Sequence, residues 1–306
     1  MAALSIIFLL IALLSSCPSG DARLYDTFLG LEKSLPKLTS YELRGNMSVL
    51  LSFDRPVEAK SIKALGLEYT ASFRGEKISI PLPRRLKRGE DAGFSLIAED
   101  EWGNTSHFIL PVFGKNDEIP TMLINELSIK GTKESPDRIE LLALDRGNIA
   151  GMVVTDGKHS YTLPDIDVGT GDIILIYWNT KAPENLSFSR HPYSTHVLDA
   201  SSPSTLSGTS GTLVLYRDHD GKIEDALIYA DGEEGIKSEE TEQRAKEIED
   251  EGEWDGGYLD SRNVTASRVF ARYPALFDRN IKEDFFITKA RASTFGYVNE
   301  IAEYVE

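Results

Sequence analysis

The chain has little cysteine and no long apolar segment beyond its start. Cys17 is the one cysteine among 306 residues, which excludes an internal disulfide and a zinc site built from several cysteines. After residue 16, no apolar run approaches the roughly 20 residues that a membrane-spanning helix needs. We therefore expect the rest of the chain to fold as a globular body in water, without disulfide support.

Basic residues are also in deficit. The sequence has 33 Lys and Arg against 49 Asp and Glu, a formal net charge of −16. More than half of the excess lies between Asp231 and Asp255, where 12 acidic residues accompany only Lys237, Arg244 and Lys246. An acidic body is repelled by phosphate backbones and by anionic membrane surfaces. We therefore expect no nucleic-acid partner.

Motifs for catalysis and for transition-metal binding are missing. None of the 5 histidines has the H-E-x-x-H spacing of a zinc helix. His191 and His196 are close in sequence but lack a neighbouring carboxylate cluster that would complete a zinc site. The segment 207–211 is not a G-x-S-x-G nucleophile elbow. The sequence thus predicts no catalytic residue, no metal site and no cofactor.

The segment 218–221, Asp-His-Asp-Gly, has the start of a calcium loop, because carboxylates at alternate positions suit a hard cation. The pattern then fails, since Lys222 occupies the next ligand position. Apolar runs flank the segment, so a hairpin turn explains it without metal. A calcium-dependent adhesion module remains an alternative.

The first sixteen residues carry no charge, and residues 4–14 are apolar apart from Ser5, which fits the apolar region of a signal peptide. Leu14-Ser-Ser-Cys17 follows at once. This resembles the bacterial lipoprotein signal, in which the cysteine is lipidated and becomes the new N-terminus. The resemblance implies a signal peptide over 1–16, lipidation of Cys17 and a tether over 17–36. It also implies a lipid-anchored protein of the cell envelope, facing the periplasm or the cell surface.

Short alternating or apolar runs separated by Gly, Pro, Asp and Asn predict an all-β fold. In residues 37–115 we expect strands at 48–54 and 67–73. Pro56 should end the first of them, since proline cannot donate to a ladder, and Gly75 should form a turn. The segment 100–106 predicts a turn in which Trp102 and Asn104 serve turn and core. The order of these pieces is similar to bacterial Ig-like domains.

Motifs are spread in order over residues 121–306: Ile-Asn-Glu at 124–126, Ile-Glu-Leu at 139–141, Gly151, Leu-Pro at 163–164, Gly-Asp at 171–172, the runs 212–216 and 225–229, and the closing segment 293–299. This order resembles the lamin-tail domain, an Ig-like sandwich found in nuclear lamins and in many secreted bacterial proteins. Met152 stands where that family usually has Trp, and Phe295 where it usually has Pro. The two resemblances imply two Ig-like β-sandwich domains in tandem.

The acidic insert at 231–260 matches nothing in the lamin-tail pattern. It is rich in helix formers, but Ile236, Ala245 and Ile248 are its few apolar residues in the stretch 232–251. We expect either a solvated helix over one end of the sandwich or a mobile loop. A solvated face explains its acidity, and binding of a cation or of a basic partner is the alternative.

In bacteria, lamin-tail-like domains often accompany secreted hydrolases or nucleases as attached modules that do not carry the chemistry. The resemblances together therefore imply a non-enzymatic binding or attachment module in the cell envelope. Its partners would be the membrane, through the N-terminal lipid, and an unknown protein or envelope component. The long loop at 181–210 and the acidic insert are the expected contact regions. An extracytoplasmic hydrolase is an alternative, and it would require histidines and carboxylates to converge from separate loops.

Overall fold

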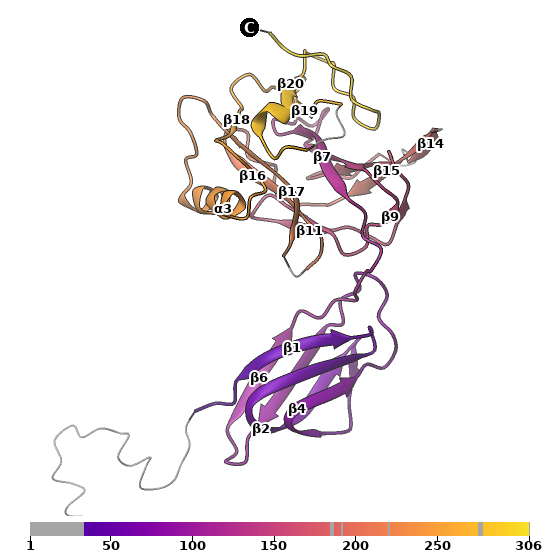
Figure 1. Ribbon diagram of the computed structural model, residues 1–306, viewed down its shortest axis with the longest axis vertical. Coiled ribbons are helices and arrows are strands. Elements are labelled where there is room, and N and C mark those ends of the chain that lie inside the picture. The colour runs from indigo at the N-terminus through magenta and orange to yellow at the C-terminus, as the bar shows by residue number, and fades with distance from the viewer. Residues whose placement is uncertain (1–33, 184–186, 191, 220, 275–277, 306) are drawn as a thin grey trace, which may run out of the picture. The chain divides into compact units, whose positions relative to one another are not determined.

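The computed structural model describes residues 34–305 except 184–186, 191, 220 and 275–277 (Figure 1). The predicted signal peptide and Cys17 lie outside these residues. Contacts divide the chain into two compact units, one ending at Arg85 and resuming over Ala92–Val112, the other made of Leu86–Asp91 and Phe113–Glu306. Residues 86–91, part of the connection between the fourth and fifth strands, thus go with the second unit, although they fall within the predicted first domain. Apart from one α-helix and one 3-10 helix, the described elements are strands, and the predicted all-β class is confirmed.

The first unit is one twisted sheet in the order β1-β2-β5-β6, with β3 and β4 also pairing with β2. β2 is long enough to pair with β1 over 48–53, with β4 over 48–52 and 57–59, and with β5 over 58–63. Alternate residues of β5 are buried, as expected of strands that face a core on one side. The strands are β1 (Leu38–Arg44), β2 (Ser48–Ala64), β3 (Leu67–Glu68), β4 (Phe73–Pro81), β5 (Phe94–Glu99) and β6 (Thr105–Leu110).

Two strand predictions for this unit are wrong. β2 does not end at Pro56, because the register against β4 shifts between Ser52 and Val57 and the proline lies in that irregular stretch. A missing N–H there removes no ladder hydrogen bond. The predicted strand at 67–73 is reduced to Leu67–Glu68, and Gly75 lies inside β4 with a φ of 142° instead of forming a turn.

The second unit contains two large sheets and a two-stranded one. The larger sheet has the order β14-β15-β13-β8-β7-β19-β20, the smaller β11-β10-β16-β17-β18, and β12 pairs with β9. The strands of the larger sheet are β7 (Met122–Ser128), β8 (Arg138–Ala143), β13 (Ile173–Tyr177), β14 (Phe188–Arg190), β15 (Tyr193–Asp199), β19 (Phe270–Arg272) and β20 (Phe285–Ile287). The others are β9 (Gly147–Asn148), β10 (Val153–Thr155), β11 (Ser160–Thr162), β12 (Asp167–Val168), β16 (Gly211–Tyr216), β17 (Ile223–Ala230) and β18 (Leu259–Asp260).

The core of the second unit is apolar and is supplied by both large sheets. Ile124 and Ile176 of the larger sheet belong to the same buried cluster as Leu213 and Leu227 of the smaller one. The ring centroids of Tyr229 and Phe270, one from each sheet, are 5.9 Å apart. Met152, for which the lamin-tail resemblance predicted tryptophan, is fully buried in this cluster. These contacts give the second unit the predicted sandwich character.

The acidic insert forms the helix α3 (Glu239–Asp250), which is the helical one of its two predicted alternatives. Ser238 caps it by accepting a hydrogen bond from the Thr241 amide at 3.4 Å. Ala245 and Ile248 are buried on the helix, and Trp254 after it is 2% exposed, so the insert adds to the core. Figure 1 shows α3 beside β16 and β17, and contacts join the helix to both strands.

The prediction of a continuous loop over 181–210 is wrong for the middle of this segment. Residues 193–199 form β15, which pairs in parallel with β13, from Ile173 beside Thr195 to Tyr177 beside Asp199. The Ser, Thr, Pro and His content of this stretch is typical of a loop, but an available sheet edge outweighs that local preference. Among the described residues, no helix is long and apolar enough to cross a membrane.

Candidate functional site

The most extensive buried polar site in the second unit joins β7 and β8 to the closing segment 294–299. We call it the closing clamp, and Glu126 and Glu140, both fully buried, are its anchors. Both carboxylate oxygens of Glu126 accept the Thr294 amide at 3.0 Å. Glu140 accepts the Gly296 amide at 2.5 Å on Oε2 and the Asn125 side chain at 2.7 Å on Oε1. The clamp consists of Asn125, Glu126, Glu140, Thr294, Gly296 and Asn299.

Asn299 completes this site by hydrogen bonding to backbone carbonyls of two strands, β7 and β19. Its Nδ2 donates to the Arg272 carbonyl at 2.8 Å and to the Asn125 carbonyl at 3.1 Å. Its Oδ1 accepts from Asn125 Nδ2 and from Thr294 Oγ1, each at 3.0 Å. Phe295, at the position of the usual lamin-tail proline, lies 4.0 Å from the Arg138 guanidinium, ring centroid to Cζ. The motif residues 125, 126, 140, 294, 296 and 299, which are far apart in sequence, therefore form one contact network.

Burial dominates the electrostatics of the clamp. Loss of hydration raises the pKa of Glu126 to about 7, although the hydrogen bonds from Thr294 and the Arg138 charge oppose the shift. Burial and the nearby Glu126 raise the pKa of Glu140 well above its usual range. Perturbed carboxylates of this kind are typical of acid–base sites. Here, however, their oxygens meet donors from the chain itself, which is the arrangement of a structural site.

The raised pKa of Glu126 predicts a pH-dependent stability. A glutamate in the unfolded chain has an ordinary pKa of 4.5, so between that pH and about 7 only the folded state keeps a proton on Glu126. Stability therefore falls as the pH rises through this window. Between pH 5 and 7.5 we expect wild-type protein to lose about 2 kcal/mol more than Glu126→Gln, as judged by urea unfolding. The exposed Glu134→Gln is the control, and equal pH slopes for wild type and Glu126→Gln would refute this origin.

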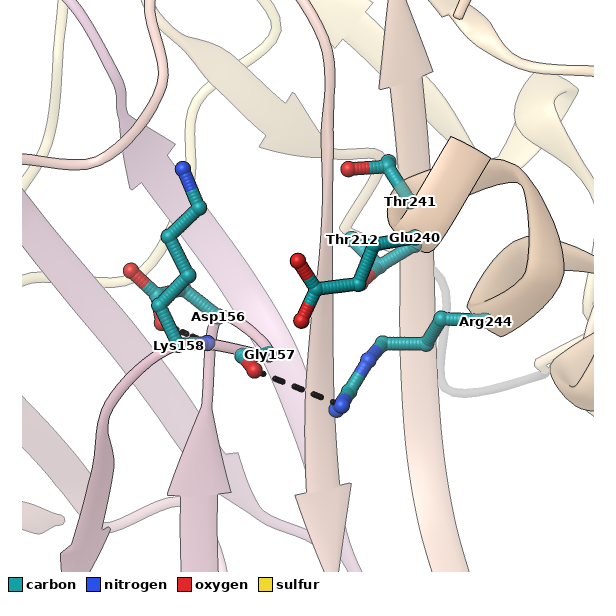
Figure 2. A pocket seen from close by; sticks show the side chains of 7 residues that line it. All are labelled: Asp156, Gly157, Lys158, Thr212, Glu240, Thr241 and Arg244. Carbon is teal, nitrogen blue, oxygen red and sulfur yellow. Dashed lines mark hydrogen bonds between the residues drawn. The ribbon is translucent and has the colours of Figure 1, made fainter. Parts of the chain in front are cut away.

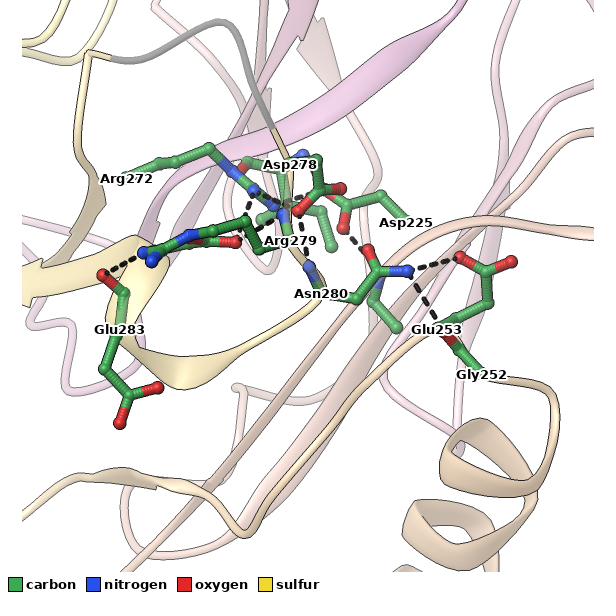
Figure 3. A network of polar contacts seen from close by, with 11 residues as sticks. Asp225, Gly252, Glu253, Arg272, Asp278, Arg279, Asn280 and Glu283 are labelled. Atoms are coloured by element: carbon green, nitrogen blue, oxygen red, sulfur yellow. Dashed lines mark hydrogen bonds and ion pairs between the residues drawn. The ribbon is translucent and has the colours of Figure 1, made fainter.

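A second buried network surrounds Arg272, whose side chain is 4% exposed. It donates to Asp225 Oδ2 at 2.7 Å, to Asp278 Oδ1 at 2.8 Å and to the Ile124 carbonyl at 2.9 Å. Figure 3 shows the side chains of Asp225 and Asp278 gathered at the guanidinium group of Arg272. The network fixes β19 to β7 and to β17 of the opposite sheet.

The carboxylate of Asp225 is the most deeply placed acid of this network. Burial raises its pKa to about 7, although Arg272 and the amides of Ile124 and Ala226 oppose the shift. The two amides donate to it at 2.6 and 2.8 Å. Its partners Ile124, Ala226 and Arg272 come from β7, β17 and β19, so the Asp225–Arg272 pair joins strands of the two sheets.

One shallow pocket lies between α3 and the hairpin that joins β10 to β11. Figure 2 shows Arg244 reaching from the helix toward Gly157, whose carbonyl accepts its Nη2 at 3.3 Å. Asp156 is committed to the hairpin turn, since its Oδ1 accepts the amides of Lys158 and His159 at 2.8 and 2.7 Å. Lys158, Thr212, Glu240 and Thr241 complete the lining. The pocket offers mixed charges for a small polar group, and its lining contains no histidine.

The histidines that the structure describes have separate surroundings. His159 Nδ1 lies 3.0 Å from Ser204 Oγ and 3.9 Å from Asp156 Oδ2. A catalytic relay needs the serine and the acid on opposite ring nitrogens, so this arrangement is not a triad. His196 lies 3.9 Å from Asp172, and His219 stacks on Phe113 with centroids 3.4 Å apart. His191 lies outside the described residues.

The described residues contain no group of three or more His, Cys, Asp and Glu that could hold a metal ion. In the segment with the calcium-like start, Gly221 has a φ of 87° and lies between β16 and β17, which form an antiparallel pair. This is the geometry of the predicted hairpin turn. Asp220 of the same segment lies outside the described residues.

The turn at 100–104 has the predicted backbone role but a different side-chain arrangement. Asp100 Oδ1 accepts the amides of Trp102 and Asn104 at 3.0 and 2.9 Å, which confirms the turn. The indole of Trp102 is not in the core, since the residue is 48% exposed. It lies instead at the surface, 5.9 Å from the Arg55 guanidinium.

Sequence reasoning did not single out the residues of the two buried networks as a site. Asn125, Glu126, Glu140 and Asn299 were visible only as letters of the lamin-tail pattern, and no local signal marked Arg272 among 33 basic residues. An acidic or amide residue within an apolar strand pattern, such as Asn-Glu at 125–126, is the one signal that pointed to them.

Comparisons with known proteins give one family. Residues 120–287 match the model of a family described as "protein second domain", which covers β7 to β20 and ends before the closing segment. Searches of curated proteins and of solved structures found no match. The family model covers more than half of the chain, and the protein therefore belongs to this second-domain family.

Proposed function

We propose that the protein is a lipid-anchored module of the cell envelope that binds or attaches a partner and performs no reaction of its own. The observation that carries this proposal is the closing clamp. Its six residues belong to the lamin-tail pattern, and Glu126 and Thr294 meet across 168 positions of the chain. Residues of one structural motif should contact each other in the folded domain even when they are far apart in sequence, and these six do. The lamin-tail-like identity of the second domain is therefore part of the proposal.

The proposed attachment role is supported by the hydrogen bonds of the buried acidic groups in the second unit. Glu126, Glu140 and Asp225 have raised pKa values, but each accepts hydrogen bonds from backbone amides of its own chain. A rigid sandwich held in this way is a support for surface features. The exposed acidic face of α3, with Glu239, Glu240 and Glu242 in its first turn, is the surface that we propose to contact a partner.

The anchoring part of the proposal rests on Cys17 and the apolar segment before it. Acylation of this cysteine would hold the tether, and through it both units, at a membrane without a spanning helix. We expect Cys17→Ala to abolish incorporation of labelled fatty acid and to move the protein from the membrane to the soluble fraction. Lys33→Ala in the same tether is the control and should leave both unchanged. Retention of the Cys17→Ala protein in membranes would contradict the proposal.

A further inference from the structure

The first unit has a well-defined end at which the described chain begins. We call it the proximal end, residues 34–37, 54–56 and 100–106. Arg55 donates to Ser34 Oγ at 2.7 Å, and the Lys37 amide donates to Asp54 at 2.9 Å. The Ser106 hydroxyl donates to the Pro36 carbonyl at 2.8 Å. These bonds hold the start of the domain against the two loops of this end.

Two large apolar side chains project from the proximal end. Trp102 is 48% and Leu35 is 55% exposed. Both lie near Arg55, because its guanidinium lies 5.9 Å from the Trp102 ring and also binds Ser34, the neighbour of Leu35. The Asp100 carboxylate fixes the Trp102 backbone at 3.0 Å. The indole is therefore presented to solvent by an ordered turn.

The proximal end is distinct from the end at which the chain leaves this unit. β6 begins at Thr105, beside the proximal end, and runs to Leu110, and the unit ends at Val112. Six strand residues span roughly 20 Å. The Pro111 carbonyl, just past the end of β6, accepts the hydroxyl of Tyr41, the middle residue of β1, at 3.3 Å and so lies away from the proximal end. Trp102 and Leu35 therefore lie on the side from which an N-terminal tether arrives.

The charge of the first unit differs from that of the whole chain. Its described residues, 34–85 and 92–112, contain nine Lys or Arg and eight Asp or Glu, a net charge of +1. At the proximal end, Asp54 and Asp100 lie 3.1 and 3.7 Å from the Arg55 guanidinium. The acidic excess of the protein thus lies outside the described residues of the first unit. A phospholipid surface would therefore not repel the first unit.

We propose that the proximal end is a membrane-facing surface, with Trp102 and Leu35 seated in the interfacial region of the bilayer. The inference rests on the proposed anchor at Cys17. The 17 steps from Cys17 to Ser34 span at most about 60 Å when fully extended, so the anchor keeps this end within reach of lipid. An indole suits that region because it joins an apolar ring to an N–H donor. Two such contacts would orient the first unit on the membrane.

The tryptophans of the chain allow a direct test. There are 3 of them, and Trp178 and Trp254 are 0% and 2% exposed, so Trp102 alone reports the surface. The acylated full chain is reconstituted into vesicles of phosphatidylcholine and phosphatidylethanolamine, with and without bromine atoms on the acyl chains. We expect brominated lipid to quench the wild-type emission and to leave the emission of Trp102→Phe unchanged.

Matched variants define the surface further. Leu35→Ser should reduce the quenching, whereas Ile109→Ser, which alters a 77% exposed residue of β6, should leave it as in wild type. Because the first unit is nearly neutral, added salt should not weaken the quenching. Quenching that survives in Trp102→Phe would overturn the inference, as would equal losses in the two serine variants.

The outcomes separate this inference from the anchoring proposal. Protein that floats with the vesicles but shows equal emission in brominated and ordinary lipid keeps its anchor and overturns the membrane-facing surface. Protein that carries no acyl group and fails to float overturns both proposals. Flotation together with quenching that depends on Trp102 supports both.

Discussion

Replacing Arg272 with methionine should lower the free energy of unfolding by about 3–5 kcal/mol, the cost of leaving a buried charge without its partner. Arg272 is 3% exposed and holds Asp225, Asp278 and the Ile124 carbonyl together. Without the guanidinium, Asp225 would remain in the core with only backbone amides as partners. Urea unfolding of Arg272→Met beside wild type measures the effect.

A second substitution tests the physical reason. Adding Asp225→Asn to Arg272→Met removes the stranded carboxylate and should recover part of the loss, so the two effects should not add. Arg262→Met is the control, because the Arg262–Asp260 pair is at the surface, with side chains 43% and 38% exposed. Exposed pairs contribute little. If Arg272→Met cost no more than this control, the network would not be a source of stability.

Asn299→Ala should be the second large effect, with a loss of about 2–4 kcal/mol from buried polar groups that no longer have partners. Asn299 is 5% exposed, and its amide bonds the Arg272 carbonyl and the backbone and side chain of Asn125. We expect faster hydrogen exchange at the Thr294 and Gly296 amides, because the closing segment would separate from Glu126 and Glu140. Urea unfolding and exchange followed by mass spectrometry measure the two effects.

The neighbouring Glu300→Ala is the matched control for this segment, because Glu300 is exposed. It should leave both stability and exchange unchanged. Equal behaviour of Asn299→Ala and Glu300→Ala would show that the closing segment is not held by the clamp. Fast exchange of the Gly296 amide in the wild-type protein would contradict the same point.

Features with local causes could be predicted from the sequence. The turn at 100–104 is determined within five residues, because Asp100 binds the amides of Trp102 and Asn104. The helix formers of the acidic insert left a helix and a loop as alternatives, and the Ser238 cap at the start of α3 is a local feature that the structure adds. The all-β class could also be predicted from local sequence, because the alternation of apolar residues reflects which face of each strand is buried.

Features that depend on distant parts of the chain could not be predicted in this way. Whether Pro56 ends a strand depends on where β4 pairs with β2. Whether residues 193–199 form a strand depends on the free edge of β13. The clamp joins Asn125 to Asn299 across 174 positions, and only the resemblance to a family pattern connected them. A core role was expected for Trp102, but its surroundings are set by Arg55 and Ser34, which lie far from it in sequence.

We propose that the protein is held at a membrane through a lipid on Cys17. Mass spectrometry of the N-terminal peptide, taken from protein extracted with detergent from membranes of the native cell, tests it most directly. We expect a peptide that begins at Cys17 and carries the added mass of acyl groups. A peptide that retains residues 1–16, or that begins at or after Cys17 without acyl mass, would contradict it.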